Sequence, residues 1–250
     1  IEGDPGLAVG NVVGSNIANI GLILGVTALI CPIPVKLHVV RMDAIIMLVV
    51  TFVAVLLMLG AGMNRIEGGV LVFLLLVFIT RSYIEGRKPG DETEAANLVE
   101  AERELEEEFG AKEGGSILVS ILLVVGGLVM RYVGSGWLVS GAEALAEMAG
   151  VSSAVIGLSL VAFGTSVPEL AVSVVGALRK KPDVAIGNIL GSNIFNLLCV
   201  LGFTGLFSPE PLPTTEGFWV RHAPVILVLS IAVIPLMLPS WRISRVQGSL

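Results

Sequence analysis

Long stretches of apolar residues, separated by short polar connections, run through this chain of 250 residues. The seven longest cover residues 7–31, 42–62, 68–84, 116–149, 152–178, 184–207 and 218–238. Most of them reach the roughly 20 residues that a helix needs to cross a bilayer core of about 30 Å. A membrane β-barrel would instead show short segments of alternating polarity. The pattern therefore predicts an all-α membrane protein, a polytopic helix bundle with about seven to eight helices present.

Composition supports this prediction, because 54% of the residues are hydrophobic and only 14% are charged. The formal net charge is −6, and most of the acidic residues lie between Glu85 and Glu113, so no basic patch indicates a nucleic-acid partner. Residues 85–115 contain a dense run of glutamates and are predicted to be a solvated linker.

Lysine and arginine lie mainly on alternate connections between the apolar stretches. One side collects Lys36, Arg41, Arg81, Arg87, Lys88, Arg103, Lys112, Arg179, Lys180, Lys181, Arg242 and Arg245, and the other collects Arg65 and Arg221. Because positive charge favours the cytoplasmic side, the first set and the acidic linker are predicted to be cytoplasmic.

A ten-residue motif occurs twice in the chain. GNVVGSNIAN at residues 10–19 and GNILGSNIFN at residues 187–196 are identical at seven of ten positions, with an offset of 177. Five predicted crossings separate the two copies, so the copies have opposite orientations in the membrane. Inverted-topology repeats are typical of secondary transporters, which bind substrate near the bilayer midplane between the two halves.

Each copy carries a polar side chain at every fourth position, which forms one stripe along a helix. The stripes consist of Asn11, Ser15 and Asn19, and of Asn188, Ser192 and Asn196. Such a stripe either holds helices together by hydrogen bonds or coordinates a ligand. We favour coordination for four of these residues, Ser15, Asn19, Ser192 and Asn196, and helix packing or capping for Asn11 and Asn188.

The apolar stretch 152–178 contains the segment VAFGTSVPE, which ends at Glu169. An acidic residue in a membrane helix is costly, about 2.5–3.5 kcal/mol on insertion scales, and therefore indicates a function. Pro168 lacks an amide hydrogen, so we expect it to break the helix and to free the carbonyl of Gly164, beside the hydroxyls of Thr165 and Ser166. Such hard oxygen ligands suit Ca²⁺ and Na⁺. The alternative is a neutral Glu169 that hydrogen-bonds to a neighbouring helix.

The GTSVPE segment followed by GNILGSNIFN resembles the signature repeats of the calcium/cation antiporter superfamily, in its prokaryotic sodium/calcium exchanger-like branch. The resemblance implies ten helices in two inverted halves, in a prokaryotic cell (inner) membrane. It implies alternating access, in which Na⁺ displaces Ca²⁺, with no enzymatic activity and no cofactor besides the transported ions. It implies eight ion ligands: the Ala162 carbonyl, Thr165, Ser166, Glu169, Ser192, Asn196, Ser15 and Asn19.

The resemblance also implies a division into domains and shows where this sequence differs from the family pattern. Residues 1–84 correspond to the C-terminal part of a first repeat with three helices, and residues 116–250 to a second repeat with four helices and the start of a fifth. The family pattern places another PE helix before Asp4, so we expect a chain truncated at both ends and, from these residues alone, no exchange. Asn196 stands where some relatives carry Asp. The oligomeric state is left open, and a monomer is allowed.

Three other functions are alternatives to the exchange of Na⁺ for Ca²⁺. A proton/Ca²⁺ antiporter would use Glu169 as the proton carrier, whereas the hydroxyls before it favour Na⁺. A non-transporting membrane scaffold would follow from a truncated chain. An intramembrane hydrolase with Ser166 as nucleophile would need a histidine or lysine base within a span, whereas His38 and His222 flank spans.

Overall fold

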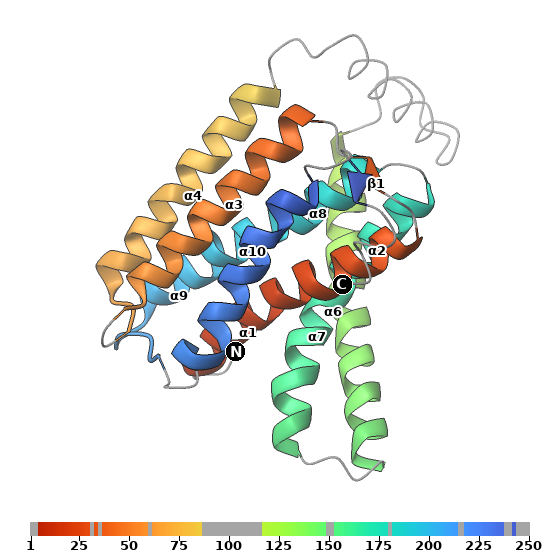
Figure 1. The fold of residues 1–250 in the computed structure, drawn as a ribbon. Coiled ribbons are helices and arrows are strands. Elements are labelled where there is room, and N and C mark those ends of the chain that lie inside the picture. Colours follow the sequence, from red (N-terminus) through yellow and green to blue (C-terminus); the bar gives the residue numbers. More distant parts are fainter. Residues whose placement is uncertain are drawn as a thin grey trace. The chain divides into compact units, whose positions relative to one another are not determined.

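The computed structural model describes almost entirely helical structure (Figure 1). The described residues are 5–30, 33–34, 37–59, 62–86, 117–148, 153–179, 182–214, 218–237 and 242–243. The acidic run of the predicted linker 85–115 lies outside them, so its solvated state stays a prediction.

The helices follow the apolar stretches of the sequence. They are α1 (Pro5–Ala18), α2 (Leu24–Ile30), α3 (Leu37–Leu57), α4 (Arg65–Gly86), α6 (Ile117–Met148), α7 (Ser153–Leu178), α8 (Pro182–Phe195), α9 (Gly202–Phe207) and α10 (Ala223–Met237). Three π-helical segments complete them: η1 (Asn19–Ile23), η2 (Asn196–Leu201) and η3 (Phe218–His222). The two-residue strands β1 (Ile33–Pro34) and β2 (Arg242–Ile243) pair antiparallel.

Five of these segments are long and apolar enough to cross a membrane. They are Ala8–Ile30, Val40–Leu57, Arg65–Glu85, Val184–Phe207 and Phe218–Pro235. Ile121–Gly134 and Gly164–Leu178 are shorter apolar helices within the fourth and fifth predicted spans. Length and composition thus confirm a polytopic all-α membrane protein.

The chain divides into two compact units, Ile1–Leu75 with Ser135–Leu250, and Leu76–Gly134. The second unit contains the end of α4, where Arg81 and Glu85 form an ion pair of 2.7 Å. The first unit contains both copies of the repeated motif and all the predicted site residues.

In the first unit, α7 packs against α8 and α1, while α3 packs against α8 and α10. Branched and unbranched apolar side chains such as Ile23, Met47 and Ile189 fill the spaces between these helices. Other large apolar side chains, among them Phe52 and Val228, face outward, as expected where lipid rather than water surrounds a protein.

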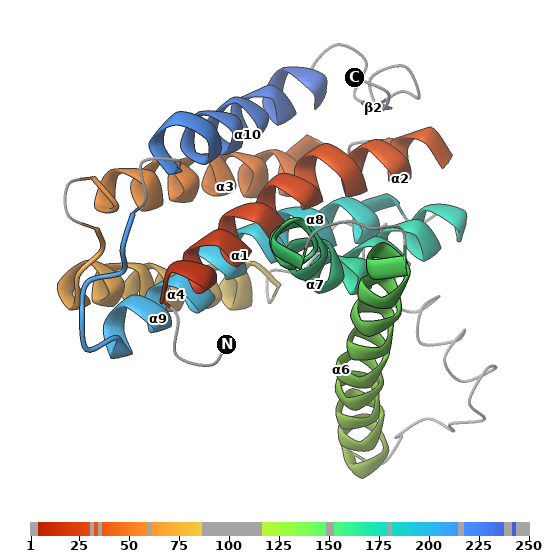
Figure 2. The ribbon, with the colours of Figure 1, turned by 90° about the horizontal axis from the view of Figure 1, so that it is seen from below.

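The two repeat copies adopt the same local structure. Helix α1 continues through η1 into α2, and α8 continues through η2 into α9, with α1 and α2 following one another in a single rod (Figure 2). The π-helical segments begin at Asn19 and at Asn196, which occupy equivalent positions in the repeat. The sequence repeat is therefore also a structural repeat.

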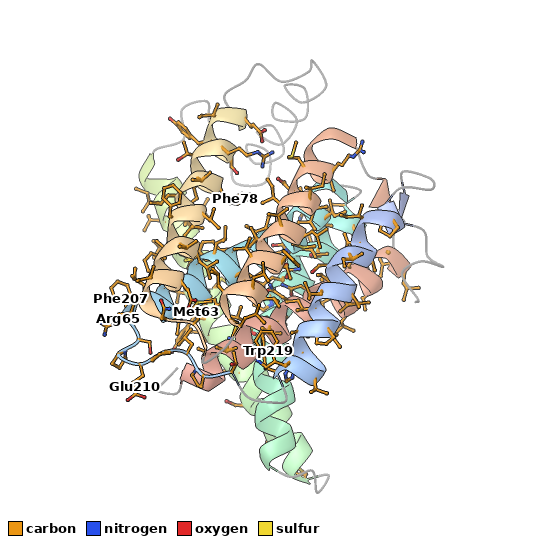
Figure 3. All side chains as sticks on the ribbon, turned by 60° about the vertical axis from the view of Figure 1, so that its left-hand side comes forward. Met63, Arg65, Phe78, Phe207, Glu210 and Trp219 are labelled. Atoms are coloured by element: carbon orange, nitrogen blue, oxygen red, sulfur yellow. The ribbon has the colours of Figure 1, made fainter. Side chains whose placement is uncertain are left out.

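Connections far apart in the sequence meet at each end of the spans. At one end Met63 forms an antiparallel bridge with Leu212, and Arg65 Nε donates to the Ser208 carbonyl at 2.9 Å. Figure 3 shows Met63 and Arg65 near Phe207 at this end. The β1–β2 pair joins two connections that the charge pattern predicts to be cytoplasmic. Both pairings agree with the predicted alternation of sides.

Pro168 lies within α7, which is helical without interruption from Ser153 to Leu178. The break that the sequence suggested here is therefore not a break in the helix. A proline still removes one donor from the helical ladder, so the oxygen of Gly164 lacks its usual amide partner.

Candidate cation-binding site

Buried polar groups gather on one face of α7. Ser166, Glu169 and Ser173 are 3%, 8% and 0% exposed, and their spacing of three and four residues places them on the same side of the helix. Glu169 is the only acidic residue in α7. Burial of a carboxylate among apolar side chains requires nearby polar groups or a cation.

Helix α1 brings its polar stripe against α7. The Ser15 hydroxyl lies 2.8 Å from the Thr165 hydroxyl, and Thr165 Oγ1 donates to Asn11 Oδ1 at 3.2 Å. A hydroxyl has one proton to donate, so Ser15 is the donor to Thr165. These contacts join the two repeats directly, because Ser15 belongs to the first copy and Thr165 lies beside the second.

Helix α8 holds α7 from another side. Asn188 Nδ2 donates to the backbone oxygen of Glu169 and to Ser173 Oγ, both at 3.0 Å. The Ser173 hydroxyl also lies 3.4 Å from the Ala185 carbonyl. Asn188 thus anchors the turn of α7 that carries the Glu169 side chain, in agreement with its predicted packing role.

An asparagine network connects α1 and η1 with α8 and η2. Asn16 Nδ2 donates to the Asn193 backbone oxygen at 3.1 Å, and Asn19 Nδ2 donates to Asn193 Oδ1 at 3.0 Å. Asn196 Nδ2 donates to Asn16 Oδ1 at 3.0 Å. The last two bonds are equivalent under the repeat, because each joins a π-turn asparagine of one copy to the other copy's internal asparagine.

Ser166 Oγ and Asn19 Oδ1 are buried oxygens of the predicted site that have no hydrogen-bond partner among the described residues. Buried polar oxygens are usually satisfied, so each needs a ligand, a water molecule or an ion. Hydroxyl and amide oxygens are among the ligands that Ca²⁺ accepts.

Among the residues that the structure describes, only some of the predicted ligands contact one another. Ser15 and Thr165 are in direct contact, and Asn19 and Asn196 are joined through the asparagine network. Ser192 is half-buried in α8, one helical turn before Asn196. Ala162 lies in α7, and its surroundings are outside the described part of the structure. Their role as ion ligands stays a prediction.

Asn16 and Asn193 were not among the predicted site residues. Both are nearly fully buried, at 1% and 0% exposed. The signal was present in the sequence, because both belong to the identical GSNI part of the repeat. They were missed because they lie beside the stripe of four-residue spacing rather than on it.

The described residues contain no cluster of three or more His, Cys, Asp or Glu side chains. A cation held in this part of the chain would therefore use mainly neutral oxygens with one carboxylate. Two inverted copies of an oxygen-lined helix with a candidate site of this kind between them are typical of secondary ion transporters.

The chain belongs to the sodium/calcium exchanger protein family, which it matches over residues 1–84 and 119–250. The family consists of membrane cation exchangers, so the family prediction and the multi-pass membrane location are confirmed. The sequence is 34% identical to the inner membrane protein YrbG of Escherichia coli, over 97% of this chain and 71% of that protein. It is 30% identical to the sodium/calcium exchanger MaX1 of Methanosarcina acetivorans, over 99% of this chain and 77% of that protein.

The structure is also similar to solved structures. One of them is the sodium-calcium exchanger NCX_Mj soaked with Na⁺ and Sr²⁺, with a TM-score of 0.75 and 32% sequence identity. The alignment covers 98% of this chain and 73% of that chain. The likeness therefore extends over nearly all of the present sequence.

Proposed function

We propose that this protein exchanges Ca²⁺ for Na⁺ across the membrane by alternating access, with both ions binding between α1, α7 and α8. The observation that supports this most strongly is the contact between Ser15 and Thr165, which joins the two repeats close to buried Glu169. In secondary transporters the substrate binds at such a junction of inverted repeats.

The charges of the site fit competition between the two ions. Glu169 supplies one negative charge, while Ser15, Thr165 and Ser166 supply neutral oxygens that can replace part of an ion's hydration shell. Na⁺ and Ca²⁺ share a preference for such oxygen ligands, and Ca²⁺ tolerates irregular geometry. An ion of either kind would therefore occupy overlapping positions, so that binding of one displaces the other.

Transport assays in proteoliposomes test this proposal. We expect the full-length protein to take up Ca²⁺ when an outward Na⁺ gradient is imposed, and to show little uptake when K⁺ replaces Na⁺. The Glu169→Gln variant should lose this uptake, because the neutral amide no longer compensates the charge of a dehydrated Ca²⁺. Glu210→Gln is the matched control, since Glu210 is exposed in the connection after α9.

A pH gradient is the second arm of the assay. Uptake that follows the pH gradient and ignores Na⁺ would replace the proposal with proton/Ca²⁺ exchange. Uptake that is unchanged in Glu169→Gln would show that the transported ion does not depend on this carboxylate.

A further inference from the structure

Two buried asparagines, each hydrogen-bonded to the side chain of another asparagine, occupy equivalent positions in the two repeats. Asn16 and Asn193 are separated by the repeat offset, are nearly fully buried, and each accepts a hydrogen bond from a predicted ligand, Asn196 or Asn19. An asparagine side chain offers an oxygen on one branch and an NH₂ group on the other. Only the oxygen branch can bind a cation, so the orientation of each ligand amide decides whether it attracts or repels the ion.

The amide of Asn196, in the second repeat, is oriented by Asn16, whose own orientation is determined by a backbone carbonyl. Asn16 Nδ2 donates to the backbone oxygen of Asn193 at 3.1 Å. A carbonyl cannot donate, so the NH₂ group of Asn16 must point toward it. The Oδ1 atom of Asn16 therefore faces the side chain of Asn196 and accepts from its NH₂ group at 3.0 Å. The oxygen of Asn196 is then left on the branch away from Asn16.

The amide of Asn19, in the first repeat, is oriented by Asn193, whose own orientation is determined by a methionine sulfur. Asn193 Nδ2 lies 3.5 Å from Met47 Sδ, which can only accept a hydrogen bond. Asn193 Oδ1 therefore accepts from Asn19 Nδ2 at 3.0 Å. The remaining oxygen of Asn19 is buried and has no hydrogen-bond partner among the described residues.

We propose that Asn16 and Asn193 are positioning residues that fix the amide orientation of Asn196 and Asn19, so that oxygen and not NH₂ faces the transported cation. This inference rests on the proposed function, because it requires Asn19 and Asn196 to bind the ion. Each repeat supplies the residue that orients the ligand of the other repeat. The two halves of the site are thereby coupled without a charged group.

Isothermal titration of Ca²⁺ into the solubilised full-length protein tests the positioning role. Asn16→Ala frees the amide of Asn196 to rotate, and we expect the Ca²⁺ affinity to fall about tenfold, as for the loss of one hydrogen bond to a buried group. In an Asn196→Asp background the same substitution should change the affinity less than about twofold, because both branches of a carboxylate are oxygens. A merely structural role of Asn16 would reduce affinity equally in both backgrounds.

Ser230→Ala is the matched control, since Ser230 is fully buried in α10 and its hydroxyl has no hydrogen-bond partner among the described residues. It should leave Ca²⁺ affinity unchanged. If Asn16→Ala fails to fold, Asn193→Ala with and without Asn19→Asp makes the same comparison in the other repeat. An equal loss in both backgrounds overturns the positioning role.

Two further outcomes separate this inference from the proposed function. A Ca²⁺ affinity that falls in Asn196→Ala but not in Asn16→Ala overturns the positioning role alone. An affinity that is unchanged in Asn196→Ala removes Asn196 from the ligands, and the positioning role with it.

Discussion

At the scale of single residues, the Thr165 hydroxyl is one of the points where the two repeats meet. It accepts a hydrogen bond from Ser15 and donates one to Asn11, so both of its hydrogen-bonding functions are in use. An ion that enters between α1 and α7 would exchange these contacts for coordination. In the proposed mechanism the Thr165 hydroxyl would therefore contribute both to closing the site and to binding the ion.

Replacing Thr165 separates the hydroxyl from the volume of the side chain. Thr165→Val keeps the shape and removes the hydroxyl, and we expect the Ca²⁺ concentration for half-maximal uptake to rise about tenfold. Thr165→Ser keeps the hydroxyl and should stay within about twofold of the parent. Equal uptake kinetics in the parent and the valine variant would show that this hydroxyl does not take part.

The sequence predicted some of the residues that lie at the contact between the repeats, but not how their hydrogen bonds are arranged. The four-residue spacing identified Ser15 and Asn19 as one stripe, and the structure shows Ser15 in contact with Thr165. The roles of Asn16 and Asn193 could not be predicted, because they depend on the crossing of α1 and α8. Amide orientation is a property of that crossing and not of either helix alone.

At the scale of elements, α9 and the first turns of α4 pack backbone against backbone. A Cβ atom at Gly68 would overlap the backbone nitrogen of Leu206, and a Cβ at Gly205 would lie 3.2 Å from Gly68 Cα. The start of α4 is held by a capping box, in which Asn64 Oδ1 accepts from the Glu67 amide at 3.1 Å and Glu67 Oε2 accepts from the Asn64 amide at 2.6 Å. Close packing of this kind is typical of membrane helices.

Gly68→Ala should therefore destabilise the protein. Its methyl group would force α4 and α9 apart, and overpacking of this kind costs about 1–3 kcal/mol. Thermal unfolding of the detergent-solubilised protein measures the effect as a lower Tm. Gly69→Ala is the matched control, because its Cβ would meet only a flexible Leu206 methyl at 3.8 Å. Similar Tm values for the two variants would contradict this packing.

Helix positions were predicted well, whereas the internal irregularities of the helices were not. Long apolar stretches place the spans, because a bilayer sets their minimum length. The π-helical segments at Asn19 and Asn196 were not predicted, and α7 continues through Pro168 where an interruption was expected. A single shifted backbone hydrogen bond leaves the apolar pattern almost unchanged. The positions of such irregularities therefore depend on contacts between helices, which the pattern does not show.

At the scale of the whole molecule, the inverted repeat could be recognised from the sequence alone. The copies at residues 10–19 and 187–196 share seven of ten residues, and a π-helical segment begins at the last residue of each copy, Asn19 and Asn196. Such a symmetry gives a transporter two equivalent ways to open, one toward each side of the membrane. The ion ligands themselves stay a prediction, because their assignment rests on the family pattern and on the orientation of oxygens.

The central claim is that Ca²⁺ and Na⁺ compete for one site around Glu169. It is tested most directly by titrating Ca²⁺ into the solubilised full-length protein while Na⁺ replaces K⁺ at constant ionic strength. We expect the apparent Kd for Ca²⁺ to rise steadily as Na⁺ increases, and Ca²⁺ binding to be lost in folded Glu169→Gln. An apparent Kd that is the same in Na⁺ and K⁺, or binding that persists in Glu169→Gln, would contradict the account.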